Sequence, residues 1–420
     1  MAREGNQTLQ AHEARAQMKA QLPLQASPAF LPSVSVGMQG MRTTDPVGVF
    51  GLKLRQENFA GEDLALDALN RPDAYSGFNT TATVQMPILA PEGLFGYQAA
   101  KKAAEAEAAG ARRAAGATRF FTIQAYTGAL LAARQVEALD AALEAVRGHV
   151  AQADAMHEQG LVTGLDARMA RLKGSEIEVH RLAAAAQAEN ALSGLKAMLN
   201  LPDTVGLVLV DNLADLDIPS ACSTAGETAG GEAAGEACSW EQRGDLQAYT
   251  AGAEAASKGV KKAWASQLPA VAAFGSLGHY AKSAPFGNGS GDWTIGIGLS
   301  WTPFNGLAGV GSVRAARAEE TAVKAERNAA YRQAEVEVLQ AQRMLEAARD
   351  GADVASRAAG EARIALEQAR ARYTSGTAPI TELLDVQAAS TNATLSELSA
   401  RRDLVLAHAA LDLAYGVFDR

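Results

Sequence analysis

Residues 372–387 read RYTSGTAPITELLDVQ and interrupt one of the longest helical patterns in the chain, since no proline occurs from 304 to 378. Gly376 and Pro379 break this pattern, because glycine adopts left-handed backbone angles and proline cannot donate a helical hydrogen bond. Two acids, Glu382 and Asp385, follow at once, and a helical pattern then resumes. The stretch therefore predicts two long helices joined by a short turn, with carboxylates just past it.

The composition of this 420-residue chain limits its function classes. A net charge of −9 argues against nucleic-acid binding, which needs basic patches. Hydrophobic residues make up 48% and aromatic residues only 5%, which favours closely packed long helices over a bulky core. No run approaches the roughly 18 apolar residues of a membrane-spanning helix. The start, MAREGNQTLQ, lacks the pattern of a secretory signal.

The chain contains two copies of one sequence pattern. FLPSVSVG (30–37) recurs as QLPAVAAF (267–274), a shift of 237 residues. Three pairs share a second shift, of 216 residues: Pro87 with Pro303, Gly160 with Gly376, and Leu195 with Leu411. The difference between the shifts, 237 − 216 = 21, predicts an insertion of 21 residues in the first copy, within residues 42–77. Insertions collect in exposed loops, so we expect a long loop there.

Each copy reads as helix, strand, loop, strand, long helix, break and helix. A helix from about Gly93 to about His157 would be roughly 100 Å long, at 1.5 Å per residue. Between the copies, residues 197–242 contain eight acids and neither lysine nor arginine, so this stretch is the natural linker. It holds Cys222 and Cys238, which either close a surface loop as a disulfide or are separate thiols.

The strand candidates alternate apolar and polar residues. In DWTIGIGLSW (292–301), Ile295 and Ile297 face one way while Thr294 and Gly296 face the other. Such segments are typical of membrane β-barrel strands, but alternation alone also fits a half-buried soluble hairpin. Four strands are too few to close a barrel, and unpaired edges are not tolerated in lipid. Membrane strands would therefore have to be pooled from several chains.

The order of the motifs resembles the TolC-like outer-membrane efflux proteins, the outer membrane factors. The second copy carries RGDLQA, LPAVAAFG, LSWTPFNGLAGVGSVRAARA, RYTSGTAPITELLDVQ and ALDLAYG in the order of that family's second repeat. The first copy, with NQTLQA, FLPSVSVG, MPILAPEGLFGYQAAKKA, MHEQGLVTGLDAR and LKAMLNLP, resembles its first repeat. The resemblance implies a mixed all-α and membrane-β fold: a trimeric α-helical barrel continued by a 12-stranded β-barrel, with four strands per chain and two internal repeats.

The resemblance also implies a division of the chain. In repeat 1, residues 1–30 would form the N-terminal helix, 31–88 a β-hairpin with a long extracellular loop, and 89–200 a periplasmic helical hairpin. In repeat 2, residues 243–268 would form a helix, 269–304 a β-hairpin and 305–420 a second periplasmic helical hairpin. Residues 201–242 would be an acidic, Gly/Ala-rich linker in the equatorial region. Because the family carries a signal and an earlier first helix, we expect the start of this chain to be trimmed or misassigned.

The implied function is a passive exit duct in the outer membrane of a Gram-negative bacterium, with its helices in the periplasm. The implied partners are two further copies in a homotrimer, a periplasmic adaptor (membrane fusion) protein, an inner-membrane pump and outer-membrane lipid, without nucleic acid. The duct of a type I protein-secretion system and a soluble coiled-coil structural protein stay as alternatives. No nucleophile–base set or metal-ligand spacing is visible, so we expect no enzyme activity, cofactor or metal, and most histidines on solvated helix faces.

In the family the long helices turn back at a periplasmic tip, where the tunnel narrows. Gly160, Gly376 and Pro379 match the tip turns. Asp166, Glu382 and Asp385 match acids at the closed entrance. Tyr373 matches a tyrosine that hydrogen-bonds across to the acid at the position of Asp166 and latches the tip; these four residues are the implied entrance and gating set.

Helix capping is the alternative interpretation of these acids. Thr163 and Asp166 have the spacing of a capping box, and Glu382 lies near a helix start, where the helix dipole favours a carboxylate. Capping does not explain Asp385, which lies a turn further along. Asp385 is therefore the residue that separates the two interpretations.

Overall fold

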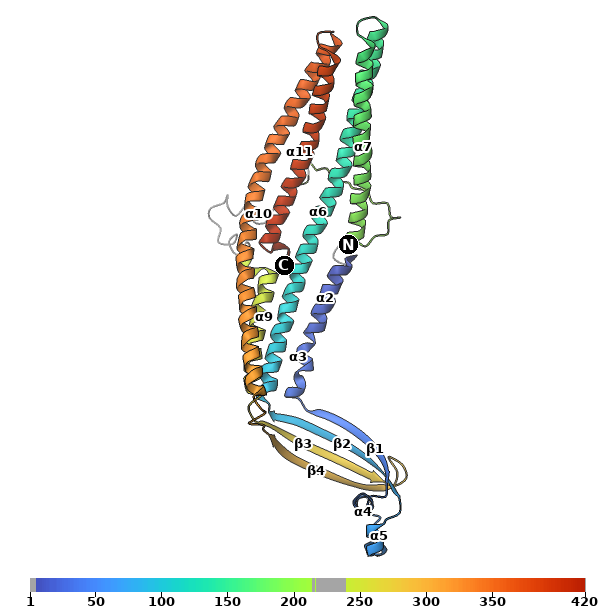
Figure 1. Ribbon diagram of the computed structural model, residues 1–420, viewed down its shortest axis with the longest axis vertical. Helices are drawn as coiled ribbons and strands as arrows, with labels where there is room; N and C mark the ends of the chain where they lie inside the picture. The colour runs from blue at the N-terminus through green and yellow to red at the C-terminus, as the bar shows by residue number, and fades with distance from the viewer. Residues whose placement is uncertain (1–4, 214–215, 217–238, 420) are drawn as a thin grey trace. The chain divides into compact units, whose positions relative to one another are not determined.

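The structure is a computed structural model that describes residues 5–213, 216 and 239–419. The chain forms two compact units (Figure 1). Unit 1 contains Met1–Gln17, Ala106–Tyr249 and Glu326–Arg420, and unit 2 contains Met18–Glu105 and Thr250–Ala325. Cys222 and Cys238 lie outside the described residues, so the state of the two thiols stays a prediction.

Unit 2 contains a four-stranded antiparallel sheet in the order β1-β2-β3-β4. The strands are β1 (Ser33–Thr43), β2 (Tyr75–Leu89), β3 (Ala270–Ala281) and β4 (Gly289–Ser300). Each sequence copy contributes two of them. Within the described chain β1 and β4 each pair on one side only, so the sheet has two open edges.

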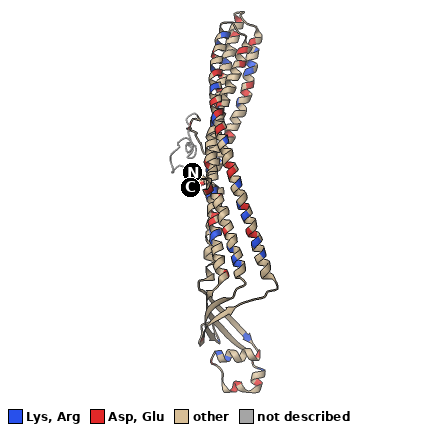
Figure 2. Cartoon of the chain, turned by 90° about the vertical axis from the view of Figure 1, so that its left-hand side faces the viewer, with Lys and Arg blue, Asp and Glu red and all other residues tan. Residues whose placement is uncertain are grey.

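The two faces of this sheet differ in polarity. The register places Val36, Ala82, Leu277 and Trp293 side by side across the four strands, and we call their face the apolar face. One residue back along β1, Ser35 lies in a row with Thr83, Ser276 and Thr294 on the polar face. Large side chains of the apolar face are exposed, up to 76% for Ile295. The strands carry few charged side chains compared with the helices (Figure 2).

Residues 44–74, which we call the insertion, join β1 to β2 and are folded. They contain α4 (Pro46–Arg55), the 3-10 helix η2 (Gly61–Leu64) and α5 (Leu66–Asn70). Asp45 caps α4, because its Oδ2 accepts a hydrogen bond of 2.7 Å from the Gly48 amide. The 21 extra residues predicted for the first copy lie in this region, which in the second copy is the short turn between β3 and β4.

Four long helices dominate the rest of the chain: α6 (Pro91–Glu158), α7 (Gly164–Met198), α10 (Ala308–Thr374) and α11 (Ile380–Ala414). The repeat offset is kept, since α7 and α11 differ by 380 − 164 = 216 at their starts and by 414 − 198 = 216 at their ends. The shorter helices are α2 (Gln7–Ala20), α3 (Leu22–Gln25), η1 (Ser27–Ala29), η4 (Trp240–Gln242), α9 (Gly244–Ala265) and η5 (Val417–Asp419). Among the described residues, none of these helices is long and apolar enough to cross a membrane.

The core of unit 1 is built from small and aliphatic side chains between long helices. One cluster joins Leu139, Leu143 and Val146 of α6 to Ile177 of α7. A second joins α10 to α11 through residues such as Val338 and Leu411. Alanines on the buried faces let helix backbones approach closely, which explains how so little aromatic surface suffices.

A cluster of charged side chains, with Arg243 and Asp419 buried, joins four parts of unit 1. The Arg243 guanidinium is 3% exposed and lies 2.7 Å from Asp245 Oδ2 and 2.8 Å from Glu337 Oε2. Near the end of the chain, Asp419 Oδ2 accepts a hydrogen bond of 2.8 Å from the Gly244 amide, and its Oδ1 lies 3.5 Å from Arg113 Nη1. The cluster joins η4 and the start of α9 to α6, α10 and η5.

Candidate functional site at the two helix turns

The two turns that end α6 and α10 have the same backbone geometry. Gly160 has φ +74° and Gly376 has φ +71°, the left-handed region that favours glycine. The Gly160 amide donates to His157 O (2.9 Å), and the Leu161 amide donates to Met156 O (2.9 Å). The same two bonds recur at Gly376 and at the residue after it. Both turns are therefore Schellman motifs, which satisfy the last carbonyls of a helix.

The helix after the second turn begins as the sequence indicates. Pro379 has φ −74° and ψ 156° and is the N-cap residue of α11, one position before the first helical turn. Its carbonyl accepts a hydrogen bond of 3.2 Å from the Glu382 amide. Proline suits this position, because the missing amide hydrogen has no helical partner at a helix start.

The capping box predicted for Thr163 and Asp166 does not form. Thr163 is the N-cap residue of α7, but its side chain accepts no hydrogen bond from the helix. Its Oγ1 instead donates to Asp166 Oδ1 at 3.3 Å. The two side chains form a hydrogen bond with each other and none with backbone amides. The capping interpretation of Asp166 is therefore supported only by the position of this carboxylate near the helix start, where the helix dipole favours it.

Glu382 and Asp385 differ in their surroundings. The Arg372 guanidinium donates to Glu382 Oε1 across the turn, an ion pair that the sequence pattern does not indicate. Asp385 is exposed and makes no hydrogen bond or ion pair with another described residue. Within one chain, therefore, Glu382 is partly neutralised and Asp385 presents a free carboxylate one turn further along α11.

Tyr373 lies in the core behind the turn and not on its surface. It is 1% exposed and packs in a cluster with Ala170 of α7, Ala369 of α10, and Leu383 of α11. Its hydroxyl has no hydrogen-bond partner among the described residues, so the expected bond to Asp166 is not made within this chain. Burial raises the pKa of Tyr373, and the nearby Asp166 carboxylate raises it further.

Replacing Tyr373 by phenylalanine shows whether the Tyr373 hydroxyl forms a hydrogen bond that latches the turn or whether the side chain only fills the core. Because the hydroxyl is buried without a partner, we expect Tyr373→Phe to leave the apparent unfolding temperature unchanged or to raise it, measured by circular dichroism of the purified protein. Tyr373→Ala is the control, and we expect a loss of about 3–5 kcal/mol from the cavity. A Tyr373→Phe protein as unstable as the alanine variant would show that the hydroxyl bonds to another subunit.

His149 is an exception to the expectation that most histidines lie on solvated helix faces. It lies on α6, is 2% exposed and faces Gln387 of α11 and Arg370 of α10. Burial lowers the pKa of His149, and the Arg370 charge lowers it further, so the imidazole is neutral near pH 7. Its neighbours in sequence, Gly148 and Val150, give no signal that distinguishes it from a surface histidine.

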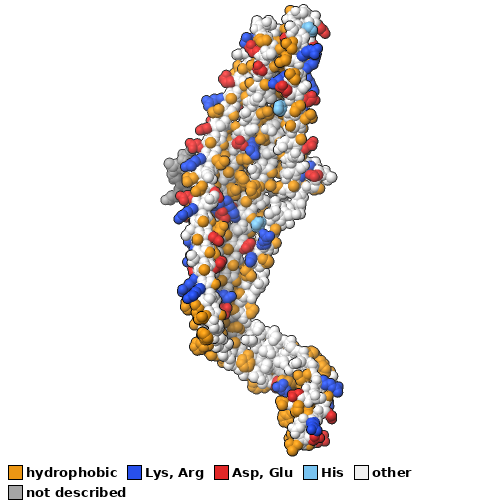
Figure 3. All heavy atoms as spheres, viewed as in Figure 1, with side chains coloured by type: hydrophobic (Ala, Val, Ile, Leu, Met, Phe, Trp, Pro, Cys, Tyr) orange, Lys and Arg blue, Asp and Glu red, His pale blue; other side chains and the backbone are white. Residues whose placement is uncertain are grey.

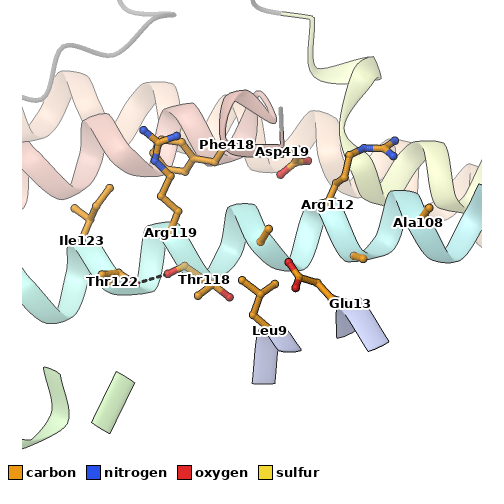
Figure 4. A pocket seen from close by; sticks show the side chains of 12 residues that line it. Leu9, Glu13, Ala108, Arg112, Thr118, Arg119, Thr122, Ile123, Phe418 and Asp419 are labelled. Atoms are coloured by element: carbon orange, nitrogen blue, oxygen red, sulfur yellow. Dashed lines mark hydrogen bonds between the residues drawn. The ribbon is translucent and has the colours of Figure 1, made fainter. Parts of the chain in front are cut away.

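A separate pocket of unit 1 contains none of the turn residues. It has a volume of about 500 Å³ and lies between α2, α6 and η5 (Figure 4). Its wall carries Glu13 and Arg112, and the Arg119 guanidinium lies 4.7 Å from the Phe418 ring centre. No group of three or more His, Cys, Asp or Glu side chains in the described part of the chain could hold a metal ion.

The C-terminal part of the chain matches a known family. Residues 239–417 match the family model described as "Outer membrane efflux protein". The match covers the second sequence copy, which includes β3, β4, α10 and α11. Among curated proteins, no sequence matches the chain.

Solved structures share the fold over the whole chain. The outer-membrane channel OprN is 18% identical with a TM-score of 0.79, and the alignment covers 100% of this chain and 89% of OprN. The outer membrane protein VceC of Vibrio cholerae is 18% identical with a TM-score of 0.79, and the alignment covers 99% of this chain and 94% of VceC. The open state of the MtrE outer membrane channel of Neisseria gonorrhoeae is 18% identical with a TM-score of 0.77, and the alignment covers 99% of this chain and 87% of MtrE.

These matches confirm the resemblance to the TolC-like outer-membrane efflux proteins. They agree with the mostly helical fold with a small sheet. They do not favour the type I secretion duct or the soluble coiled-coil protein.

Proposed function

We propose that this chain, whose residues 239–417 belong to the outer membrane efflux protein family, is one subunit of a homotrimeric efflux duct. The duct crosses the outer membrane of a Gram-negative bacterium as a 12-stranded barrel and continues into the periplasm as a helical tunnel. It works without catalysis or cofactor, and a periplasmic adaptor and an inner-membrane pump open it at the helix turns.

The sheet of unit 2 carries this proposal. Its apolar face is solvent-exposed in a single chain, with Val36 at 70% and Ile297 at 72%, and it ends in two unpaired edges. Burial of such a face is worth about 25 cal/mol per Å² of apolar surface, so something must cover it. Three chains that pair β4 of one with β1 of the next would close twelve strands, leave no edge and turn the apolar face to lipid.

The helices of unit 1 support assembly by a separate observation. Along α7, Leu165, Leu172 and Val179 are each more than half exposed and recur every seven residues, with Leu182 three residues further on. This is the spacing of a coiled-coil seam without its partner helix. We assign the partner to a neighbouring subunit, with 89–200 and 305–420 as the periplasmic hairpins and 201–242 as the equatorial linker.

In the assembled duct, the turns would form the entrance, with Gly160, Gly376 and Pro379 setting the turns. Asp166 and Glu382 would line the entrance, and Tyr373 would hold the turn from behind. Asp385 would contribute three carboxylates, one per chain. Since no side chain that the structure describes neutralises it, Asp385 should set the cation preference.

Purified protein, produced behind an outer-membrane targeting leader, is expected to form trimers in detergent and cation-preferring channels in planar bilayers. Asp385→Asn should lower the cation-to-anion permeability ratio about two-fold or more, because it removes three carboxylates from a narrow site. The measurement is the reversal potential in a salt gradient, together with the mass of the detergent-solubilised particle.

Glu382→Gln is the matched control, since its carboxylate already bonds to Arg372 and should change the permeability ratio less. Equal effects of the two variants would contradict the role given to Asp385. A protein that remains monomeric without detergent and never reaches the outer membrane would contradict the duct itself.

A further inference from the structure

The insertion between β1 and β2 is anchored on one particular face of the sheet. Figure 1 shows α4 and α5 beyond the end of the strands that is away from the start of α6. Hydrophobic and charged side chains are mixed over this segment (Figure 3). Exposed apolar residues include Val47 at 79% and Leu66 at 77%. The segment thus could lie over the lumen, over the rim or against lipid, and its contacts decide among these.

The strand register shows on which face of the sheet these contacts lie. Side chains alternate between the faces of a strand, so Tyr75 and Gly77 lie on the same side of β2 as Thr81 and Thr83. That side is the polar face. Tyr280 and Ser290 lie on the same face, because the register pairs Asn79 with Tyr280 and Tyr280 with Ser290.

The end of α4 packs directly on these residues. Tyr75 Oη donates to Gln56 Oε1 at 2.9 Å, and Gln56 Nε2 donates to Ala281 O at 3.2 Å. Ser290 Oγ donates to Arg55 O. A Cβ on Gly77 would lie 2.7 Å from Gln56 Nε2 and 2.8 Å from Leu52, so a larger residue there would displace the ends of both side chains. The end of α4 therefore lies on the polar face and is held there by these hydrogen bonds, of which that from Gln56 Nε2 is buried.

Three cations surround the two tyrosines of this contact. Lys53 Nζ lies 5.5 Å and Lys282 Nζ 5.2 Å from the Tyr75 ring centre, and the Arg55 guanidinium lies 5.1 Å from the Tyr280 ring centre. Lys53 is neutralised by Asp63, since Lys53 Nζ lies 2.5 Å from Asp63 Oδ1. Arg55 and Lys282 form no ion pair with any described residue, and both are exposed, so their charges face solvent at the insertion end of the sheet. The register places one carboxylate, Asp292, on the same polar face, where it interacts with Tyr280.

We propose that the insertion is a constriction inside the outer end of the pore, and that Arg55 and Lys282 determine ion preference there. The inference rests on the proposed function: if the apolar face contacts lipid, the polar face lines the lumen. Three chains then bring three copies of α4 into the exit, each held by Gln56. The duct then has two narrow sites in series: an acidic entrance, and an exit at which the exposed Arg55 and Lys282 side chains act beside an insertion with six acids and three bases.

Charge reversal tests the exit in planar bilayers. In the Asp385→Asn channel, whose entrance carries fewer charges, Arg55→Glu with Lys282→Glu should raise the cation-to-anion permeability ratio about two-fold or more, and less so at 1 M salt, where the screening length is about 3 Å. Arg42→Glu is the matched control, because the register places Arg42 on the apolar face of β1. An unchanged ratio in the double variant, or an equal change in the control, would overturn the proposal.

A second variant measures pore size without relying on charge. An Asn-Gly turn in place of residues 44–74 joins Thr43 to Tyr75, which are paired in the register. This channel should admit larger polyethylene glycols from the outer side than the parent channel does, with the cut-off from the turn side unchanged. An unchanged outer cut-off would place the insertion on the rim or the membrane surface. If the parent chain forms no channel, the proposed function fails, whereas a functioning parent with unaltered variants contradicts the exit constriction alone.

Discussion

Replacing Ile295 by arginine is expected to abolish assembly of the channel in the outer membrane. Ile295 is 76% exposed on the apolar face, in a row with Val84 and Gly275 across the sheet. An arginine on the lipid face of a barrel costs about 2–4 kcal/mol near the membrane midplane, and a trimer carries three copies. We expect little or no detergent-resistant trimer in outer-membrane fractions.

Thr294→Arg is the matched control, since it adds the same side chain one position away on the polar face. The register places Thr294 beside Ser276, and a lumen-facing arginine stays in contact with water. We expect this variant to assemble and to change only the ion preference of the channel. Equal loss of trimer in the two variants would show that the faces have been assigned wrongly, or that the sheet does not enter lipid.

Features that depend on local sequence could be predicted. Glycine is favoured where φ is positive, so Gly160 and Gly376 mark both turns in the sequence alone. The repeat offset of 216 also holds at a second pair of positive-φ residues, Asn200 and Gly416. The alternation of apolar and polar residues was enough to locate the strands, because it depends only on the geometry of a single strand.

Features that depend on which residues meet could not be predicted. Thr163 has the spacing of a capping residue, but its hydroxyl bonds to the Asp166 carboxylate. The pattern that places Tyr373 next to a turn does not show that its ring fills a core formed by several helices. The face beneath the insertion follows from the pairing of β1, β2 and β3, and a slip of one residue would reverse it.

The buried charge cluster is the clearest example of such a limit. Arg113, Arg243 and Asp419 are separated by more than a hundred residues and meet only once the helices have packed. In sequence, Arg243 is one more charge after an acidic linker. Its role follows from its burial, which cannot be read from the periodicity of the sequence. We therefore expect the loss of Arg243 to reduce stability strongly.

Arg243→Ala is expected to lower the free energy of unfolding by about 3–5 kcal/mol, because it leaves Asp245 and Glu337 without their buried partner. The measurement is unfolding of the purified protein by denaturant, followed by circular dichroism. Arg147→Ala is the control: Arg147 is 65% exposed and lies 3.6 Å from Glu144, so its loss should change stability by at most about 1 kcal/mol. Similar losses in both variants would mean that burial of Arg243 has no special importance.

The pH dependence of that loss identifies its cause. Burial opposes ionisation of Asp245, but the Arg243 guanidinium, together with the Arg113 charge and the Leu246 amide, outweighs burial and holds the pKa of Asp245 below its usual value of 3.8. In the parent protein this carboxylate therefore stabilises the fold above about pH 4, and the contribution is lost as pH falls through the lowered pKa. Without Arg243 the strongest group that lowers the pKa of Asp245 is lost, although Arg113 remains 3.6 Å away, so we expect this pKa to rise and the carboxylate to be protonated more readily on acidification.

The deficit of Arg243→Ala should consequently be largest near pH 7 and shrink as pH falls toward 4. Burial raises the pKa of Asp419, so this group stabilises the fold as pH falls, but it is present in both proteins and largely cancels from the difference. Adding Asp245→Asn to Arg243→Ala should recover part of the stability at pH 7 and flatten the pH dependence, because the double variant no longer buries an Asp245 carboxylate that has lost its closest guanidinium partner. A deficit that stays constant with pH would instead attribute the loss to the packing of the Arg243 side chain and not to its charge.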